Sequence, residues 1–339
     1  MEYAPVIIPT LNRDKHLKRC LDSLAANSVA KYTDIYISLD YPPSDKYVAG
    51  YERVKKLLEE YDFSGFKSHT ILYQKSNLGA VANSVLLEDT VRSFTDTVIY
   101  TEDDNEFSPN FLEYIDKGFE EFKNDDTVLY LCGSSDSRWL FPENSNVIKC
   151  KVLAAYGLGY WLSRKQKNSI EGNDWLLCPK NWTLRNFRDL YKKNRVLFWI
   201  YVSGILSTDK GLYWDGERIN FCDTSTSVYM HYSDRVCVCP AIAKSHTFGN
   251  DGSGVNMPAM DNNAKTDLDT ADTFDYLHDA DFRFDERNYR IGDSIMFSEI
   301  GALTPIRFKL FVSWIIAVYI CVTKSRRLPV FLHRLFSRK

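Results

Sequence analysis

Residues 6–13 read Val6-Ile7-Ile8-Pro9-Thr10-Leu11-Asn12-Arg13 and join a short apolar run to a polar turn. An apolar run of this length, stopped at Pro9-Thr10, is typical of a buried strand. Apolar residues then recur at helical spacing from about Asp14 onward, at positions 17, 20, 21 and 24. This spacing predicts an amphipathic helix directly after the strand.

The same alternation continues along the first 132 residues. Further strands are predicted at residues 35–39, 70–73, 98–101 and 128–131, and further helices at 51–61, at 79–94 and from Ser108-Pro109 onward. Strands that alternate with helices imply right-handed crossovers. We therefore expect an α/β fold with a mostly parallel twisted sheet flanked by helices, with ligands at the carboxyl ends of the strands.

Composition excludes several classes of protein. The chain has 339 residues, of which 45% are hydrophobic and 26% are charged, so a large core can form and disorder is excluded. The net charge of -3 gives no reason to expect a nucleic-acid partner. The eight cysteines are scattered, which favours buried thiols over a disulfide framework.

An acidic cluster carries the clearest chemical signal. Glu102-Asp103-Asp104 follows the predicted strand 98–101 directly. Three adjacent acids repel one another, and hard oxygen ligands suit Mg²⁺ or Mn²⁺ bridging a diphosphate. The alternative is a solvated acidic turn that caps the next helix. Residues 105–108 precede that helix, so capping does not require Glu102 or Asp104.

Other nucleotide-binding signatures are absent from the sequence. There is no GxxxxGK[ST] loop and no GxGxxG after the first strand. Nucleotidyltransferases that make sugar nucleotides normally carry a glycine-rich signature after their first strand. Here that position is occupied by residues 9–13, which contain no glycine.

Taken together, residues 6–13, Asp40 and the acidic cluster resemble a family 2-like glycosyltransferase of the GT-A fold. Ordered blocks between residues 4 and 255 more narrowly resemble N-acetylglucosaminyltransferase I and its bacterial relatives. These blocks are residues 19–24, 102–104 with 108–111 and 113–114, 157–161, 214–215 and 240–249 with 252–253.

The resemblance implies roles for individual residues. Arg13 and Asp40 would hold the nucleotide, with Asp40 accepting from the uracil edge. Asp104 would coordinate Mn²⁺, and Glu102 and Asp103 would support the sugar and the ribose. Asp215 would be the general base, although on the sequence alone Asp215-Gly216 is an ordinary turn pair.

The remaining candidates lie at or near the ends of predicted strands and helices. Pro9 and Thr10, where the first strand stops, are expected to bind the nucleotide-sugar donor. Asn77, Gly79 and Asn83 lie at a strand-to-helix junction whose backbone N–H groups can face a donor, although Asn77-Leu78-Gly79 is equally typical of a plain turn. His246 is a candidate metal ligand, against the alternative that a lone histidine is structural.

These features predict a metal-dependent, inverting glycosyltransferase. It would move a hexosyl or N-acetylhexosaminyl group from a nucleotide-sugar donor, with a UDP-sugar favoured, to a hydroxyl of a glycan or lipid-linked acceptor. The alternatives are a sugar-nucleotide nucleotidyltransferase and a non-catalytic carbohydrate-binding protein. We expect a donor-binding half at 1–135, an acceptor-binding half at 136–260, a linker at 261–305 and C-terminal helices at 306–339.

The C-terminal segment indicates a membrane surface. Residues 310–323 form a fourteen-residue uncharged run between basic residues, short of the about 20 residues that a bilayer span needs. Residues 328–339 mix apolar and basic side chains, as an interfacial helix on anionic lipid does. The alternative is a core helix with a basic tail. No signal peptide is recognisable, so we expect a cytoplasmic, peripheral protein.

Overall fold

The computed structural model describes residues 2–135, 141–167, 179–206, 222–249, 251–253, 267–279 and 306–336. The described residues belong to two compact units. Unit 1 is drawn from Met1–Lys149, Ala154–Gln166 and Cys237–Phe284, and unit 2 from Cys150–Leu153, Lys167–Val236 and Asp285–Lys339.

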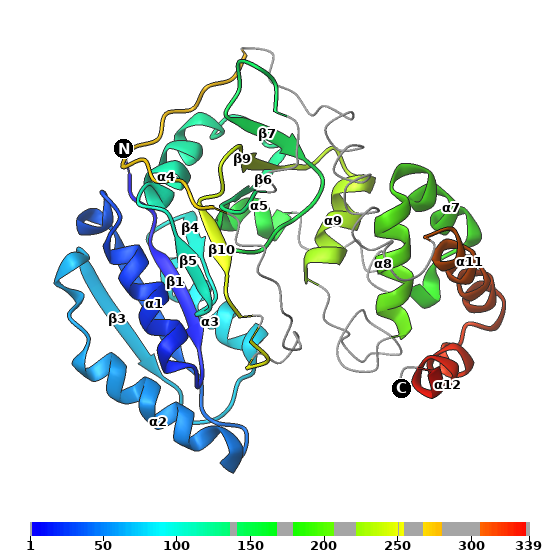
Figure 1. Ribbon diagram of the computed structural model, residues 1–339, viewed down its shortest axis with the longest axis horizontal. Coiled ribbons are helices and arrows are strands. Elements are labelled where there is room, and N and C mark those ends of the chain that lie inside the picture. The colour runs from blue at the N-terminus through cyan, green and yellow to red at the C-terminus, as the bar shows by residue number, and fades with distance from the viewer. Residues whose placement is uncertain are drawn as a thin grey trace. The chain divides into compact units, whose positions relative to one another are not determined.

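Unit 1 is built on an eight-stranded sheet with the order β3-β2-β1-β4-β8-β6-β9-β7 (Figure 1). The strands are β1 Val6–Thr10, β2 Asp34–Leu39, β3 Ser68–Tyr73, β4 Thr97–Tyr100, β6 Val128–Cys132, β7 Val147–Cys150, β8 Leu158–Trp161 and β9 Val236–Pro240. Strands β3, β2, β1 and β4 pair in parallel, as their apolar runs predict. Strand β8, where the sequence analysis predicted no strand, lies antiparallel to both β4 and β6.

Helices and short elements connect these strands. They are α1 Asp14–Ala25, α2 Asp45–Glu60, α3 Ala80–Val91, α4 Phe111–Glu121 and α5 Leu162–Lys167, with short 3₁₀ helices at Ala30–Tyr32 and Phe63–Gly65. The helix predicted from Ser108-Pro109 begins at Phe111, after Asn110. The predicted apolar face of α1 is fully buried. The α/β class with a central sheet flanked by helices is thus confirmed.

A second sheet, of two strands, lies beside the acidic cluster Glu102-Asp103-Asp104. Strands β5 (Asn105–Phe107) and β10 (Ser245–Thr247) pair antiparallel, with His246 opposite Glu106 and Thr247 opposite Asn105. The pairing brings residues 245–249 to the acidic cluster, although the two segments are far apart in the sequence.

Residues 267–279 pack along α4, within a stretch for which the sequence predicted a linker at 261–305. Asn110 donates to Asp269 at 3.0 Å, and the Phe274 N–H donates to Glu113 at 2.8 Å. The ring of Tyr276 stacks on that of Tyr114 with centroids 5.6 Å apart, and Phe274 contacts both rings edge to face at 5.0 Å. Aromatic burial and hydrogen bonds to α4 therefore hold this segment in unit 1.

Unit 2 is helical. Its helices are α7 Leu184–Lys193, α8 Arg195–Leu206, α9 Cys222–Tyr232, α11 Ile306–Thr323 and α12 Arg327–Phe336, with a 3₁₀ helix at Pro179–Asn181. Thr183 and Asn186 form a reciprocal capping box at the start of α7. Trp182, Phe187 and Tyr201 form the core, and Ala317 and Ile320 of α11 are buried in it. One face of α11 is therefore a core face, as the alternative interpretation of the C-terminal segment predicted.

Candidate functional site

Three loops of the predicted site meet at the carboxyl edge of the parallel strands. Strand β1 pairs with β2 on one side and with β4 on the other. Thr10 ends β1, Asp40 follows β2 and the acidic cluster follows β4. Because the carboxyl ends of neighbouring parallel strands share an edge, these loops are adjacent, and the Asp40 N–H donates to the Thr10 carbonyl at 2.9 Å.

Arg13 links the acidic cluster to the first loop. It immediately precedes α1, and its guanidinium donates to Asp103 through Nη2 and to Asp104 through Nη1, the latter at 2.7 Å. The Thr10 hydroxyl donates to the other oxygen of Asp103 at 2.7 Å. Burial, together with the adjacent charge of Asp104, raises the pKa of Asp103, and Arg13 opposes that shift. The guanidinium therefore compensates two carboxylates that would otherwise repel each other in a buried position.

Asp40 organises the loop before α3. Its carboxylate accepts from the N–H groups of Leu78 at 2.8 Å and Gly79 at 2.9 Å, and from the Asn77 side chain at 3.0 Å. Gly79 has a φ of 77°, a left-handed conformation that glycine adopts without steric cost. The N–H groups expected to face a donor thus bind Asp40, and the uracil contact of Asp40 stays a prediction.

Asn83 has a structural environment. Its side chain is 1% exposed and donates from Nδ2 to the Ser38 carbonyl at 3.1 Å, while the Ser38 hydroxyl donates to its Oδ1. These bonds tie α3 to β2. Asn83 therefore stabilises the junction between β3 and α3 from a buried position. Pro9, another predicted site residue, lies one residue before Thr10 within β1.

Asp104 is positioned from its other side by residues 247–249. Its backbone carbonyl accepts from the Phe248 N–H at 2.9 Å and from the Thr247 hydroxyl at 3.3 Å. A Cβ added to Gly249 would overlap the Oδ2 atom of Asp104. Residue 249 must therefore lack a side chain if the carboxylate is to keep this place.

His246 faces a different acid. Its Nε2 lies 3.0 Å from Oε2 of Glu106, its cross-strand neighbour, and Arg19 pairs with the same carboxylate oxygen. The Arg19 guanidinium also lies 4.4 Å from the centre of the Phe248 ring, which stacks on His16. In this arrangement His246 belongs to an Arg19–Glu106 network, and its role as a metal ligand stays a prediction.

The donor set at Asp104 has the chemistry that Mg²⁺ or Mn²⁺ requires. Oδ2 of Asp104 accepts from Arg13, and the neighbouring Glu102 is an exposed acid. Within the described residues no three His, Cys, Asp or Glu side chains are grouped to hold a metal. Mg²⁺ commonly binds through one or two carboxylates plus substrate phosphates. These carboxylates therefore have the chemistry for an ion that arrives with a diphosphate, and Asp104 as its ligand stays a prediction.

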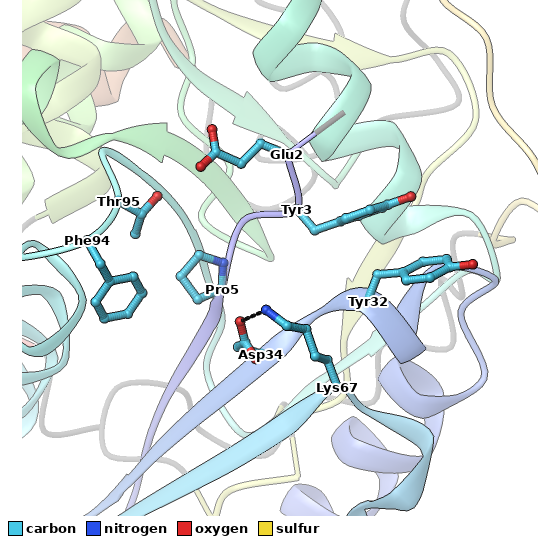
Figure 2. Close-up of a pocket in the computed structure, with 8 residues that line it drawn as sticks. All are labelled: Glu2, Tyr3, Pro5, Tyr32, Asp34, Lys67, Phe94 and Thr95. Atoms are coloured by element: carbon cyan, nitrogen blue, oxygen red, sulfur yellow. Dashed lines mark hydrogen bonds and ion pairs between the residues drawn. The ribbon is translucent and has the colours of Figure 1, made fainter.

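A separate pocket, the hollow in Figure 2, lies at the amino ends of the parallel strands, opposite to the acidic cluster. It opens where β1, β2 and β4 begin, and Lys67 pairs with Asp34 within it at 2.8 Å. Its lining residues are Glu2, Tyr3, Pro5, Tyr32, Asp34, Lys67, Phe94 and Thr95. None of the predicted site residues lines this hollow.

The predicted base lies outside the described residues. Trp214 and Asp215 fall between residues 206 and 222, so their place relative to Asp104 is not part of the structure. Two contacts that the sequence analysis missed are the Arg13 bridge and the Arg19–Glu106–His246 network. A signal for the Arg19–Glu106–His246 network was present in the sequence, because Asp104 and Glu106 alternate along the strand-like stretch 104–107.

Comparison with known proteins gives limited similarity. No protein-family model matches the sequence, and no curated protein does. Among solved structures, mannosyltransferase PcManGT from Pyrobaculum calidifontis, in complex with GDP-Man and Mn²⁺, is 14% identical with a TM-score of 0.36 over 49% of this chain and 46% of that one. S. aureus TarS is 16% identical with a TM-score of 0.33 over 50% of this chain and 30% of its own.

Mouse xyloside xylosyltransferase 1 is 11% identical with a TM-score of 0.31, over 50% of this chain and 71% of its own. The chain thus spans less than half of the length of the first two proteins. Two of these neighbours, the mannosyltransferase and the xylosyltransferase, are glycosyltransferases by name, and the similarity to all three is confined to about half of this chain.

Proposed function

We propose that this chain transfers a sugar from a nucleoside-diphosphate sugar to a hydroxyl group. The observation that carries the proposal is the buried pair Asp103–Asp104, bridged by Arg13 at the carboxyl edge of the parallel strands. Carboxylate oxygens suit a hard divalent cation, and a guanidinium suits phosphate oxygens. A site that combines the two has the groups needed to bind a cation together with a diphosphate.

The residues at the carboxyl ends of the parallel strands would have different roles in donor binding. Asp104 would hold Mn²⁺ or Mg²⁺, and Glu102 and Asp103 would support the sugar and the ribose. The bound ion would supply Lewis-acid stabilisation of the charge that develops on the departing diphosphate. Thr10 and Arg13 fix the orientation of Asp103. Asp40 orders Asn77 and Gly79 and thereby the wall of the site nearest to β2.

Proton removal from the acceptor hydroxyl requires a separate base. We assign this role to Asp215, on the resemblance of Trp214-Asp215 to the corresponding family motif. A carboxylate on the face of the sugar opposite to the diphosphate would take the proton as the hydroxyl attacks. A single in-line displacement of this kind inverts the anomeric configuration. Asp223 and Glu217 are the other acids near this position in the sequence.

The proposal includes a donor and an acceptor class. We favour a UDP-sugar that carries a hexosyl or N-acetylhexosaminyl group, with a glycan or a lipid-linked acceptor. A nucleotidyltransferase is disfavoured because residues 9–13 contain no glycine and Thr10 is used to bind Asp103. A non-catalytic carbohydrate-binding protein is disfavoured because such a protein has no need to bury two adjacent carboxylates, which costs free energy.

Calorimetric titration of UDP in the presence of Mn²⁺ tests the donor site. Asp104→Asn keeps the size of the side chain but removes its charge, and we expect the affinity for UDP to fall at least about tenfold. Asp89→Asn, at an exposed acid of α3, is the matched control and should bind as the wild type does. Equal Mn²⁺-dependent affinity in Asp104→Asn and wild type would contradict the assignment.

A further inference from the structure

Helix α11 has two apolar faces with different environments. On one face, Leu310, Ala317 and Ile320 are buried in the core of unit 2, beside α7 and α8 (Figure 1). On the other face, large apolar residues recur at intervals of three and four positions, and each is 44–75% exposed. This exposed stripe consists of Phe308, Phe311, Ile315, Val318 and Val322.

Helix α12 also exposes large apolar residues. Its residues Leu328, Phe331 and Leu332 are 41–61% exposed. Soluble monomers rarely expose large contiguous apolar patches, and such patches mark interaction surfaces. The stripe on α11 and these residues of α12 therefore need a partner that covers apolar side chains.

The charge of the same segment indicates the nature of that partner. Residues 306–339 contain eight Lys and Arg residues and no Asp or Glu, although the whole chain has a net charge of -3. Arg307 and Arg327 are exposed at the starts of the two helices. An apolar stripe on a segment whose charged residues are all basic is complementary to an anionic surface.

We propose that α11 and α12 bind an anionic lipid surface through the exposed stripe. The helices would lie along the membrane, with Phe311, Ile315 and Phe331 entering the boundary between headgroups and acyl chains. Among the helices that the structure describes, none has the length and hydropathy needed to cross a bilayer. This inference does not depend on the proposed sugar transfer.

A second copy of the chain is a less suitable partner. The interval of three and four residues would fit a pair of helices packed side by side. However, two copies of this segment would bring like charges together, and neither contributes an acid to pair with them. Phosphate headgroups supply the missing negative charge, which favours the lipid surface.

Sedimentation of the full-length protein with vesicles tests the proposal. The two compositions are phosphatidylcholine alone and phosphatidylcholine with about one third phosphatidylglycerol, because the headgroup charge is the variable under test. We expect stronger binding to the anionic vesicles than to the neutral ones. High salt should release the protein only partly, since salt screens the basic residues but not apolar burial.

Substitutions separate the apolar and basic contributions. Phe311→Gln combined with Ile315→Gln and Val322→Gln should weaken binding at least about tenfold, because these side chains carry the apolar contact. The matched control, Val48→Gln with Leu277→Gln, removes apolar groups exposed elsewhere and should bind as wild type. Arg307→Gln with Arg327→Gln should weaken binding about tenfold and reduce the salt dependence. This pair keeps the test valid if the stripe variant fails to fold.

Three results would overturn the proposal. The first is equal sedimentation with neutral and anionic vesicles. The second is equal binding by wild type and the Arg307→Gln, Arg327→Gln variant. The third is a wild-type dimer, measured by light scattering, that the stripe variant converts to a monomer. Truncation is unsuitable here, because removal of α11 would expose the core residues that it covers.

Discussion

Replacement of Arg13 by Gln tests how the acidic pair is held. In the folded protein the guanidinium contacts both carboxylates, and the side chains of Asp103 and Asp104 are 5% and 12% exposed. Gln keeps a polar side chain but supplies no positive charge. The two carboxylates would then remain buried next to each other without a compensating cation.

The magnitude follows from this burial. Removal of one partner of a buried ion pair costs about 3–5 kcal/mol, because the remaining charge is uncompensated. Protonation of Asp103 relieves part of the cost, since burial already raises its pKa. We therefore expect a loss of about 3 kcal/mol near pH 7, which corresponds to about 10 °C in the unfolding temperature. A raised pKa in the folded state means that stability is lost as pH rises, so the loss should be smaller at pH 5 than at pH 8.

Urea and thermal unfolding at several pH values measure the effect. Arg53→Gln is the matched control, because Arg53 pairs with Asp14 at 3.0 Å while its side chain is 59% exposed, and exposed pairs contribute at most about 1 kcal/mol. The double variant Arg13→Gln, Asp103→Asn should recover stability relative to Arg13→Gln, because one buried charge is removed. If Arg13→Gln loses no more stability than Arg53→Gln, the bridge does not compensate the acids as argued.

Two further predictions concern the same unit. Gly249→Ala should weaken Mn²⁺-dependent UDP binding at least about tenfold in calorimetry, because its Cβ would displace the Asp104 carboxylate. The control Gly65→Ala, where a Cβ meets only ordinary contacts, should bind UDP as wild type does. Equal binding by the two variants would refute the displacement. Asp116 is buried, which raises its pKa to about 8, against the hydrogen bond from the Ala4 N–H. Its contribution to stability is present below about pH 4 and is lost as pH rises toward 8, by at most about 1.4 kcal/mol per pH unit. Unfolding of Asp116→Asn should lack this slope, and identical pH profiles for variant and wild type would contradict it.

Local patterns in the sequence predicted the first half of the sheet well. Apolar runs bounded by polar turns located β1, β2, β3 and β4, because each is a short strand buried between helices. The sequence analysis predicted no strand at β8, because its four residues include Gly159 and its position depends on packing against α4, which is distant in the sequence. A Cβ on Gly159 would overlap Ile115 of α4, so tertiary packing admits only glycine there.

The candidate site was predicted as a set of loops, but its contacts were not. The shared edge of parallel strands brings Thr10, Asp40 and Asp104 together, and that edge follows from topology. The contact from Arg13 to Asp103 and Asp104 joins residues about 90 positions apart. No local periodicity encodes which cation compensates which acid, so such a bridge emerges only from the packed structure.

The C-terminal helix shows a different limit of sequence patterns. Residues 310–323 are uncharged throughout, so the two faces of α11 cannot be separated by polarity. In the structure one face packs into a core and the other is exposed. The core-helix interpretation describes the buried face, and the interfacial interpretation of the exposed face stays a prediction.

Release of nucleoside diphosphate is the measurement that tests the central claim most directly. The purified chain is incubated with Mn²⁺ and a panel of UDP- and GDP-sugars, and UDP, GDP and pyrophosphate are quantified together. We predict slow release of a nucleoside diphosphate from one class of donor, and its loss in Asp104→Asn but not in Asp89→Asn. Release of pyrophosphate, or release that is the same in Asp104→Asn and wild type, would contradict the account.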